Sequence, residues 1–163
     1  MAAIIRDESP SDREAVREVH RLAFGGEVEG RLVDAVRQSG DAAISLVAEQ
    51  ESRIVGHVLL SRLEAPMRAL ALAPLGVLPR YQGRGIGSAL VRSALAWAQN
   101  DGWAAIFVVG EPAFYRRFVF SVEAARGFAS PYAGEFFMVC ALVPEALATT
   151  GRIDYPAPFA DLE

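Results

Sequence analysis

The sequence predicts an α/β domain, of the α+β kind, in which helices cover one mixed sheet. Runs rich in β-branched residues alternate with runs of helical periodicity along the chain. A loop with three glycines stands where one predicted strand passes into the longest predicted helix. No internal repeat and no linker rich in proline, glycine or serine divides the 163 residues, of which 52% are hydrophobic. We therefore expect a single domain over residues 1–163, with a core large enough to fold without disulfides.

The N-terminal part of the chain predicts one strand followed by two helices. Residues 2–6 form the strand, and the capping-box pattern of residues 11–14 opens a helix that ends at Gly25 and Gly26. Residues 28–38 form a second helix, because their apolar side chains recur at helical spacing.

Three strands are predicted next. Residues 43–49 and 53–61 read as a hairpin, since both are rich in strand-forming residues and only three residues separate them. Residues 69–78 are apolar but too short for a safe helix assignment. Proline cannot donate a hydrogen bond to a neighbouring strand, so Pro74 predicts a bulge within this fourth strand.

The remaining elements complete the sheet. A helix is predicted over residues 86–99, a buried strand over 104–109, and a short helix over 112–118 that begins at a proline. Two final strands are expected over residues 119–126 and 136–143. The predicted order is β-α-α-β-β-β-α-β-α-β-β.

Composition excludes several classes of function. The formal net charge of -4 argues against an extended basic surface for nucleic acid. All 16 basic residues are arginine, which excludes a P-loop lysine and a Schiff-base lysine. Cys140 is the single cysteine, and His20 and His57 lie far apart, so we expect neither a disulfide nor a metal site. Without a membrane-length apolar run or a signal-peptide pattern, we expect a cytoplasmic protein with no membrane or nucleic-acid partner.

The glycine loop carries the strongest chemical signal. Gly83, Gly85 and Gly87 allow successive backbone N–H groups to turn toward one point at the start of a helix. Those N–H groups and the positive end of the helix dipole form an anion site, for which a diphosphate is the natural ligand. The expected binding residues are Gln82, Gly83, Arg84, Gly85, Ile86, Gly87 and Ser88.

Two common phosphate loops do not fit this segment. A P-loop needs a lysine, which the chain lacks. A dinucleotide-binding loop needs a third glycine, where Ser88 stands, and an acidic residue about 20 positions further on, where residues 104–106 are apolar.

The segment resembles motif A of the GNAT superfamily of acyl-CoA-dependent N-acetyltransferases. That motif has glutamine or arginine, two variable positions, glycine, one variable position, and glycine or alanine; Gln82, Gly85 and Gly87 match it. The resemblance continues to Tyr115 and Phe120, which match the second motif of the family, although Val119 stands where glycine is usual. Residues 68–120 carry the resemblance, and the order of elements also suits the GNAT fold.

The resemblance implies that acetyl-CoA is a co-substrate and that an amine attacks its thioester directly. The backbone of Val77 and Leu78 would then contact the pantetheine arm and donate to the developing oxyanion. Tyr115 occupies the position of the general acid that protonates the departing thiolate. The alternative is that Tyr115 is a core aromatic residue packed beside Phe114 and Phe118.

The sequence leaves alternatives for the general base, the acceptor amine and the oligomeric state. Residues 68–78 contain no acidic residue, and Glu29 is preferred because the region between the first two helices borders the acceptor site in GNAT folds. A water chain could serve instead. The other candidates are Glu27, Glu64, Glu111 and His57. A non-catalytic acyl-CoA sensor is the alternative function, the acceptor amine is unidentified, and the resemblance leaves a homodimer as one possible assembly.

Overall fold

The computed structural model describes residues 2–162, and the side chains of residues 2–160. Six strands form one sheet in the order β1-β2-β3-β4-β5-β6. Each strand pairs with the next one in antiparallel fashion, except that β4 and β5 are parallel. The strands are β1 Ile4–Asp7, β2 Ala42–Gln50, β3 Arg53–Arg62, β4 Ala69–Val77, β5 Ala105–Val109 and β6 Phe137–Ala141. The helices are α1 Arg13–Phe24, α2 Val28–Ser39, α3 Ile86–Asn100, α4 Pro112–Tyr115 and α5 Val122–Ala125.

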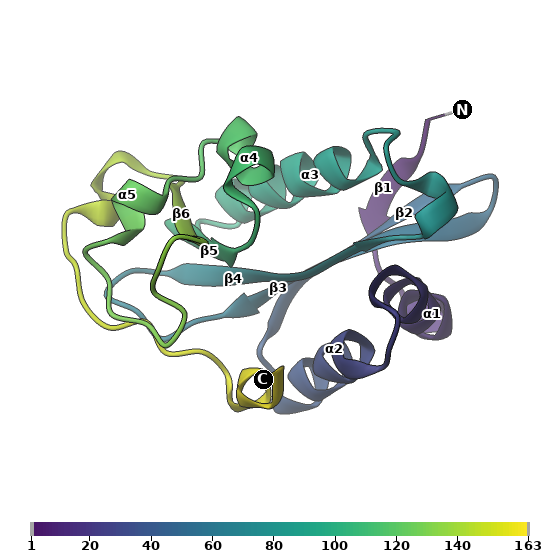
Figure 1. Cartoon of the computed structure of the whole chain (residues 1–163), viewed down its shortest axis with the longest axis horizontal. Coiled ribbons are helices and arrows are strands. Elements are labelled where there is room, and N and C mark those ends of the chain that lie inside the picture. The colour runs from purple at the N-terminus through teal and green to yellow at the C-terminus, as the bar shows by residue number, and fades with distance from the viewer. Residues whose placement is uncertain (1, 163) are drawn as a thin grey trace.

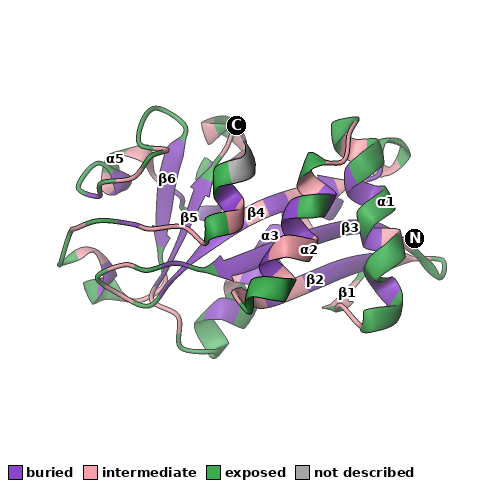
Figure 2. Ribbon diagram, turned by 90° about the horizontal axis from the view of Figure 1, so that it is seen from below, coloured by how far each residue is buried: buried purple, intermediate pink, exposed green. Residues whose placement is uncertain are grey.

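The helices form a layer on each face of the sheet, and the predicted mixed-sheet α/β fold is confirmed. Helices α1 and α2 cover one face, whereas α3 and α4 lie over the other (Figure 1). Side chains along β4 alternate between the two cores: Leu70 and Leu72 join the core under α3, and Ala69 and Ala71 join the core under α2. The buried positions follow the strands and the inward faces of the helices (Figure 2). Within the described residues, no helix is both long and apolar enough to cross a bilayer.

A bulge in β4 separates this strand from β5. Val58 of β3 pairs with Leu75, but Leu60 pairs with Leu72, so two residues of β4, the second of them Pro74, lie opposite one residue of β3. The predicted bulge at Pro74 is therefore confirmed. Strand β4 pairs with β5 only from Ala69 to Ala71. Beyond that point the two strands diverge, and the gap between them is the centre of the site described below.

The N-terminal capping box was predicted two residues too late. Asp12, rather than Glu14, accepts the backbone N–H that closes the box, from Ser9 at 2.8 Å. Arg6 also donates to the Asp12 carboxylate at 2.8 Å, which anchors this turn to β1. The Arg6–Asp12 ion pair and the proline at position 10 fix where the helical segment begins.

The predicted strand over residues 119–126 is wrong. Val119 adopts a left-handed conformation with φ of 70°, and Ser121 caps α5 by accepting a hydrogen bond from the Ala124 N–H at 3.1 Å. Only Ser121 makes a strand-like bridge, with Val139 of β6. The local cap therefore overrides the apolar pattern that favoured a strand.

Candidate active site

The glycine loop joins the end of β4 to the start of α3. Gly83 and Gly85 have φ values of 77° and 84°, which side chains other than glycine adopt only with strain. The side-chain amide of Gln82 donates to the Val77 carbonyl at 2.9 Å and so ties the loop to the last residue of β4. The first turn of α3 consequently presents its backbone N–H groups beside the end of that strand.

A cavity of about 400 Å³, which we call the coenzyme-loop cavity, lies against this turn. Arg84, expected to contact phosphate, is exposed and lies over the Tyr81 ring, 5.4 Å from its centroid, outside the lining of the cavity. Arg117 lines the cavity and was missed by the sequence analysis, because only the folded chain brings the 3-10 turn Arg116–Phe118, which follows α4, to the loop. The cavity is lined by Val77, Tyr81, Gln82, Gly83, Gly85, Ile86, Gly87, Ser88, Phe114 and Arg117.

The hydrogen bonding of β4 decides which backbone groups face the gap toward β5. The Leu78 N–H donates to the Val55 carbonyl at 2.8 Å, so the expectation that Leu78 donates to a ligand is corrected. Antiparallel pairing alternates along the strand, and the polar groups of Val77 and Leu75 therefore point away from β3 and into the gap. Leu75 was missed because neither its type nor the loop spacing marks it.

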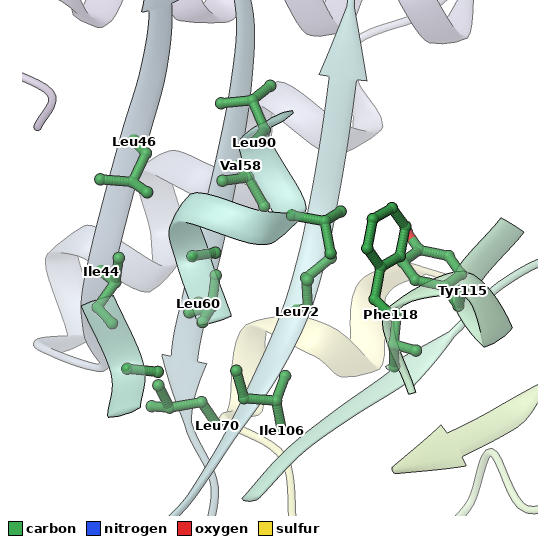
Figure 3. Close-up of a cluster of buried hydrophobic side chains, with 14 of the residues drawn as sticks. Ile44, Leu46, Val58, Leu60, Leu70, Leu72, Leu90, Ile106, Tyr115 and Phe118 are labelled. Carbon is green, nitrogen blue, oxygen red and sulfur yellow. The ribbon is translucent and has the colours of Figure 1, made fainter. Parts of the chain in front are cut away.

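Tyr115 and Glu29 line one cavity, of about 220 Å³, which we call the Glu29 cavity. Tyr115 is 9% exposed, and burial raises the pKa of its phenol to about 12, so it is protonated at neutral pH. A Cβ at Gly110 would lie 2.4 Å from the Tyr115 ring, which shows that this glycine leaves room for the ring. Figure 3 shows Tyr115 and Phe118 together beside β4, where they extend the apolar cluster that contains Leu72.

Comparison with known proteins decides the family. The model of the acetyltransferase (GNAT) family matches residues 13–120. This range includes the glycine loop, which lines the coenzyme-loop cavity, and Tyr115, which lines the Glu29 cavity. The chain belongs to the GNAT acetyltransferase family. The family predicted from the residues around the glycine loop is thereby confirmed, and the enzyme is an acyltransferase.

Similar GNAT proteins align with nearly the whole chain. The N-acetyltransferase YjhQ of Escherichia coli K12 is 33% identical over 157 residues, covering 88% of this chain and 86% of YjhQ. The crystal structure of E. coli YhbS in complex with CoA superposes with a TM-score of 0.93 at 30% identity, covering 100% of this chain and 94% of that one. A GNAT acetyltransferase from Brucella melitensis, in complex with acetyl-CoA, gives a TM-score of 0.82 at 31% identity, covering 96% and 97%.

The other predicted base candidates of this GNAT enzyme lie outside the lining of the Glu29 cavity. Glu27 lies 3.9 Å from Arg17 on the neighbouring helix, and Glu111 precedes α4 at an exposed position. The backbone of Glu64 pairs with that of Asp154. His57 is fully buried in β3.

A buried chain of polar groups runs along the α1 and α2 face of the GNAT sheet, from α1 to α2. Ser45 donates to Glu8 at 2.6 Å, so its oxygen is free to accept from His57 Nε2, which lies 2.8 Å away. Neutral His57 then accepts at Nδ1, 2.8 Å from His20 Nε2, and this leaves His20 Nδ1 as a buried acceptor for which the structure gives no partner. Glu8 in turn pairs with Arg37.

Both histidines are held neutral, and stability should depend on pH accordingly. Burial, aided by the Arg37 charge, lowers the pKa of His20 to about 4, and burial lowers the pKa of His57 well below its usual range. The unfolded chain takes up these protons below about pH 6.5, so stability is present above that pH and is lost as the pH falls. We expect each histidine to remove up to about 2 kcal/mol of unfolding free energy between pH 7 and pH 5.

Urea unfolding at pH 7, 6 and 5 measures this loss. Asp12 does not interfere in this interval, because the hydrogen bonds from Arg6 hold the pKa of its carboxyl well below the usual range. Equal unfolding free energies at pH 7 and pH 5 would show that the folded protein takes up both protons in this network and that the neutral tautomers of His20 and His57 are wrong.

Proposed function

We propose that this GNAT enzyme transfers an acetyl group from acetyl-CoA to a primary amine by direct attack in a ternary complex, with residues 1–163 acting as one domain. One observation carries the proposal: neighbouring residues line two different cavities. Val77 and Phe114 line the coenzyme-loop cavity, whereas Leu75 and Tyr115 line the Glu29 cavity. A thioester held where β4 and β5 diverge would therefore lie within reach of both.

The coenzyme side of the proposal rests on the loop. The diphosphate of acetyl-CoA would bind the backbone N–H groups between Gln82 and Ser88, at the positive end of α3. Arg117 supplies a cation at the wall of the same cavity. The pantetheine arm would run along the backbone groups of Val77 and Leu75. The CoA complex of YhbS and the acetyl-CoA complex of the Brucella enzyme support this ligand, because both relatives share the fold over nearly the whole chain.

The chemical step assigns one role to each group in the gap. The neutral amine nitrogen attacks the thioester carbonyl carbon, a C–N bond forms, and the oxyanion accepts from the backbone N–H of Leu75 or Val77. Glu29 takes the amine proton, directly or through a water molecule. When the C–S bond breaks, Tyr115 donates its phenolic proton to the thiolate of CoA. Acetylated amine and free CoA thiol are the products.

Release of free CoA thiol in the presence of amines tests the function. We expect at least one amine in a panel of monoamines, polyamines, amino acids and aminoglycosides to raise the release well above the rate without acceptor. Calorimetry with CoA is run in parallel. CoA binding without amine-dependent release would favour the non-catalytic acyl-CoA sensor, and absence of both would exclude the proposed function.

A further inference from the structure

A second cavity borders the Glu29 cavity on the acceptor side of the gap. This aromatic cavity, of about 230 Å³, shares Leu72, Ala73 and Val109 with the Glu29 cavity. Its outer wall is the C-terminal segment around Tyr155 and Phe159, which lies beside α2 on the face of the sheet opposite α3 and α4 (Figure 1). The coenzyme loop lies on the other face, so a second substrate can reach the gap from here without crossing the coenzyme.

The walls of the aromatic cavity are built from packed rings. The centroids of Tyr132 and Tyr155 are 4.7 Å apart, and those of Tyr155 and Phe159 are 5.2 Å apart. The Tyr132 hydroxyl donates to the Phe159 carbonyl at 3.2 Å, which fixes the segment in place. Phe107 of β5 completes the floor of the cavity. These rings make an enclosure that suits a flat apolar group.

Of these two neighbouring cavities, charge is confined to the Glu29 cavity. Among the described residues that line the two cavities, Glu29 is the one with a charged side chain. A substrate with a single ammonium group near Glu29 and an apolar remainder matches this distribution. A second ammonium group would lie against the rings without a carboxylate to pair with, which is unfavourable.

We propose that the acceptor is a primary monoamine joined by a short linker to an aromatic ring or a compact aliphatic group. The amine would lie between Glu29 and Tyr115, and the apolar group would occupy the aromatic cavity. A cavity of about 150 Å³ lined by apolar side chains can hold benzene, so the aromatic cavity is large enough for one ring with its linker. This assignment rests on the proposed transferase function and narrows its substrate class.

Kinetics with a matched series of amines test the assignment. With acetyl-CoA saturating, we expect kcat/KM for 2-phenylethylamine to exceed that for ethylamine and for spermidine by at least about 100-fold, a difference of about 2.7 kcal/mol in transition-state stabilisation. Val109→Phe should raise KM for 2-phenylethylamine at least about tenfold, because Val109 lines both cavities, is 47% exposed and can accept a larger side chain without burial strain. Ile4→Phe, at an exposed position of the distant strand β1, is the matched control and should change neither parameter.

A binding readout separates failure of this assignment from failure of the proposed function. In the presence of CoA, 2-phenylethylamine should raise the melting temperature of the wild type but not of Val109→Phe. Stabilisation without turnover would support the aromatic cavity as a monoamine site and overturn the transferase function. Turnover of spermidine or an aminoglycoside in preference to 2-phenylethylamine would overturn the assignment and leave the function intact. If the wild type prefers hexanoyl-CoA to acetyl-CoA and Val109→Phe loses this preference, the aromatic cavity binds the acyl chain of the donor. That result would likewise overturn the assignment.

Discussion

Replacing Tyr115 with phenylalanine should lower kcat by about 10²–10⁴-fold, the usual contribution of a general acid. The hydroxyl is protonated at neutral pH, because burial raises its pKa to about 12. A CoA thiol resembles cysteine, whose pKa in water is ~8.5. The same apolar surroundings raise the pKa of the departing thiol, and this reduces the difference in pKa between the thiol and the Tyr115 phenol. KM for acetyl-CoA should change little, since the ring keeps its packing against Phe114 and Phe120.

Steady-state kinetics and a thermal melt separate this role from a structural one. Tyr81→Phe is the matched control, because it removes the same atom from the wall of the coenzyme-loop cavity and should leave kcat unchanged. A lowered melting temperature with kcat within about threefold of the wild type would remove Tyr115 from the mechanism. That result would return it to the packing role that the neighbouring aromatic residues also permit.

Local sequence patterns were enough to predict the coenzyme loop. The turn between β4 and α3 needs residues that tolerate positive φ, and Gly83 and Gly85 supply them within three positions of each other. The bulge in β4 was likewise predictable from one residue, Pro74. In both cases the physical cause acts over a few residues, so the sequence displays it directly.

The groups that face one another across the gap could not be predicted from local patterns. Along the sequence, the rest of α2, four strands and α3 lie between Glu29 and Tyr115, although the two residues line the same cavity. Glu29 was preferred only through resemblance to GNAT folds. Arg117 carries no motif, and its place at the coenzyme-loop cavity follows from the orientation of the 3-10 turn after the short α4. The proposed oxyanion donor is Leu75 or Val77 and not Leu78, because strand pairing alternates and the Leu78 N–H donates to Val55, a partner that is not apparent from the sequence of β4.

Gly87→Val should abolish most CoA binding without destabilising the protein. A Cβ at Gly87 would lie 3.9 Å from both the Val77 and the Phe114 side chains, so it fits, and the two γ-methyl groups would extend into the coenzyme-loop cavity. Valine is at least as favourable as glycine within a helix. We expect calorimetry to give a Kd for CoA raised at least about 100-fold, equivalent to about 2.7 kcal/mol.

Gly85→Ala should have the opposite effect to Gly87→Val: it should lower stability and leave most of the CoA binding in place. The two glycines serve different purposes. Nothing lies within 4 Å of a Cβ at Gly85, but its φ of 84° strains any other residue by roughly 1–2 kcal/mol. Gly102→Ala, with a φ of 82° at the far end of α3, should lose as much stability while binding CoA normally. If Gly87→Val binds CoA as the wild type does, the diphosphate does not pass between Val77 and Phe114, and the loop would then serve only the turn into α3.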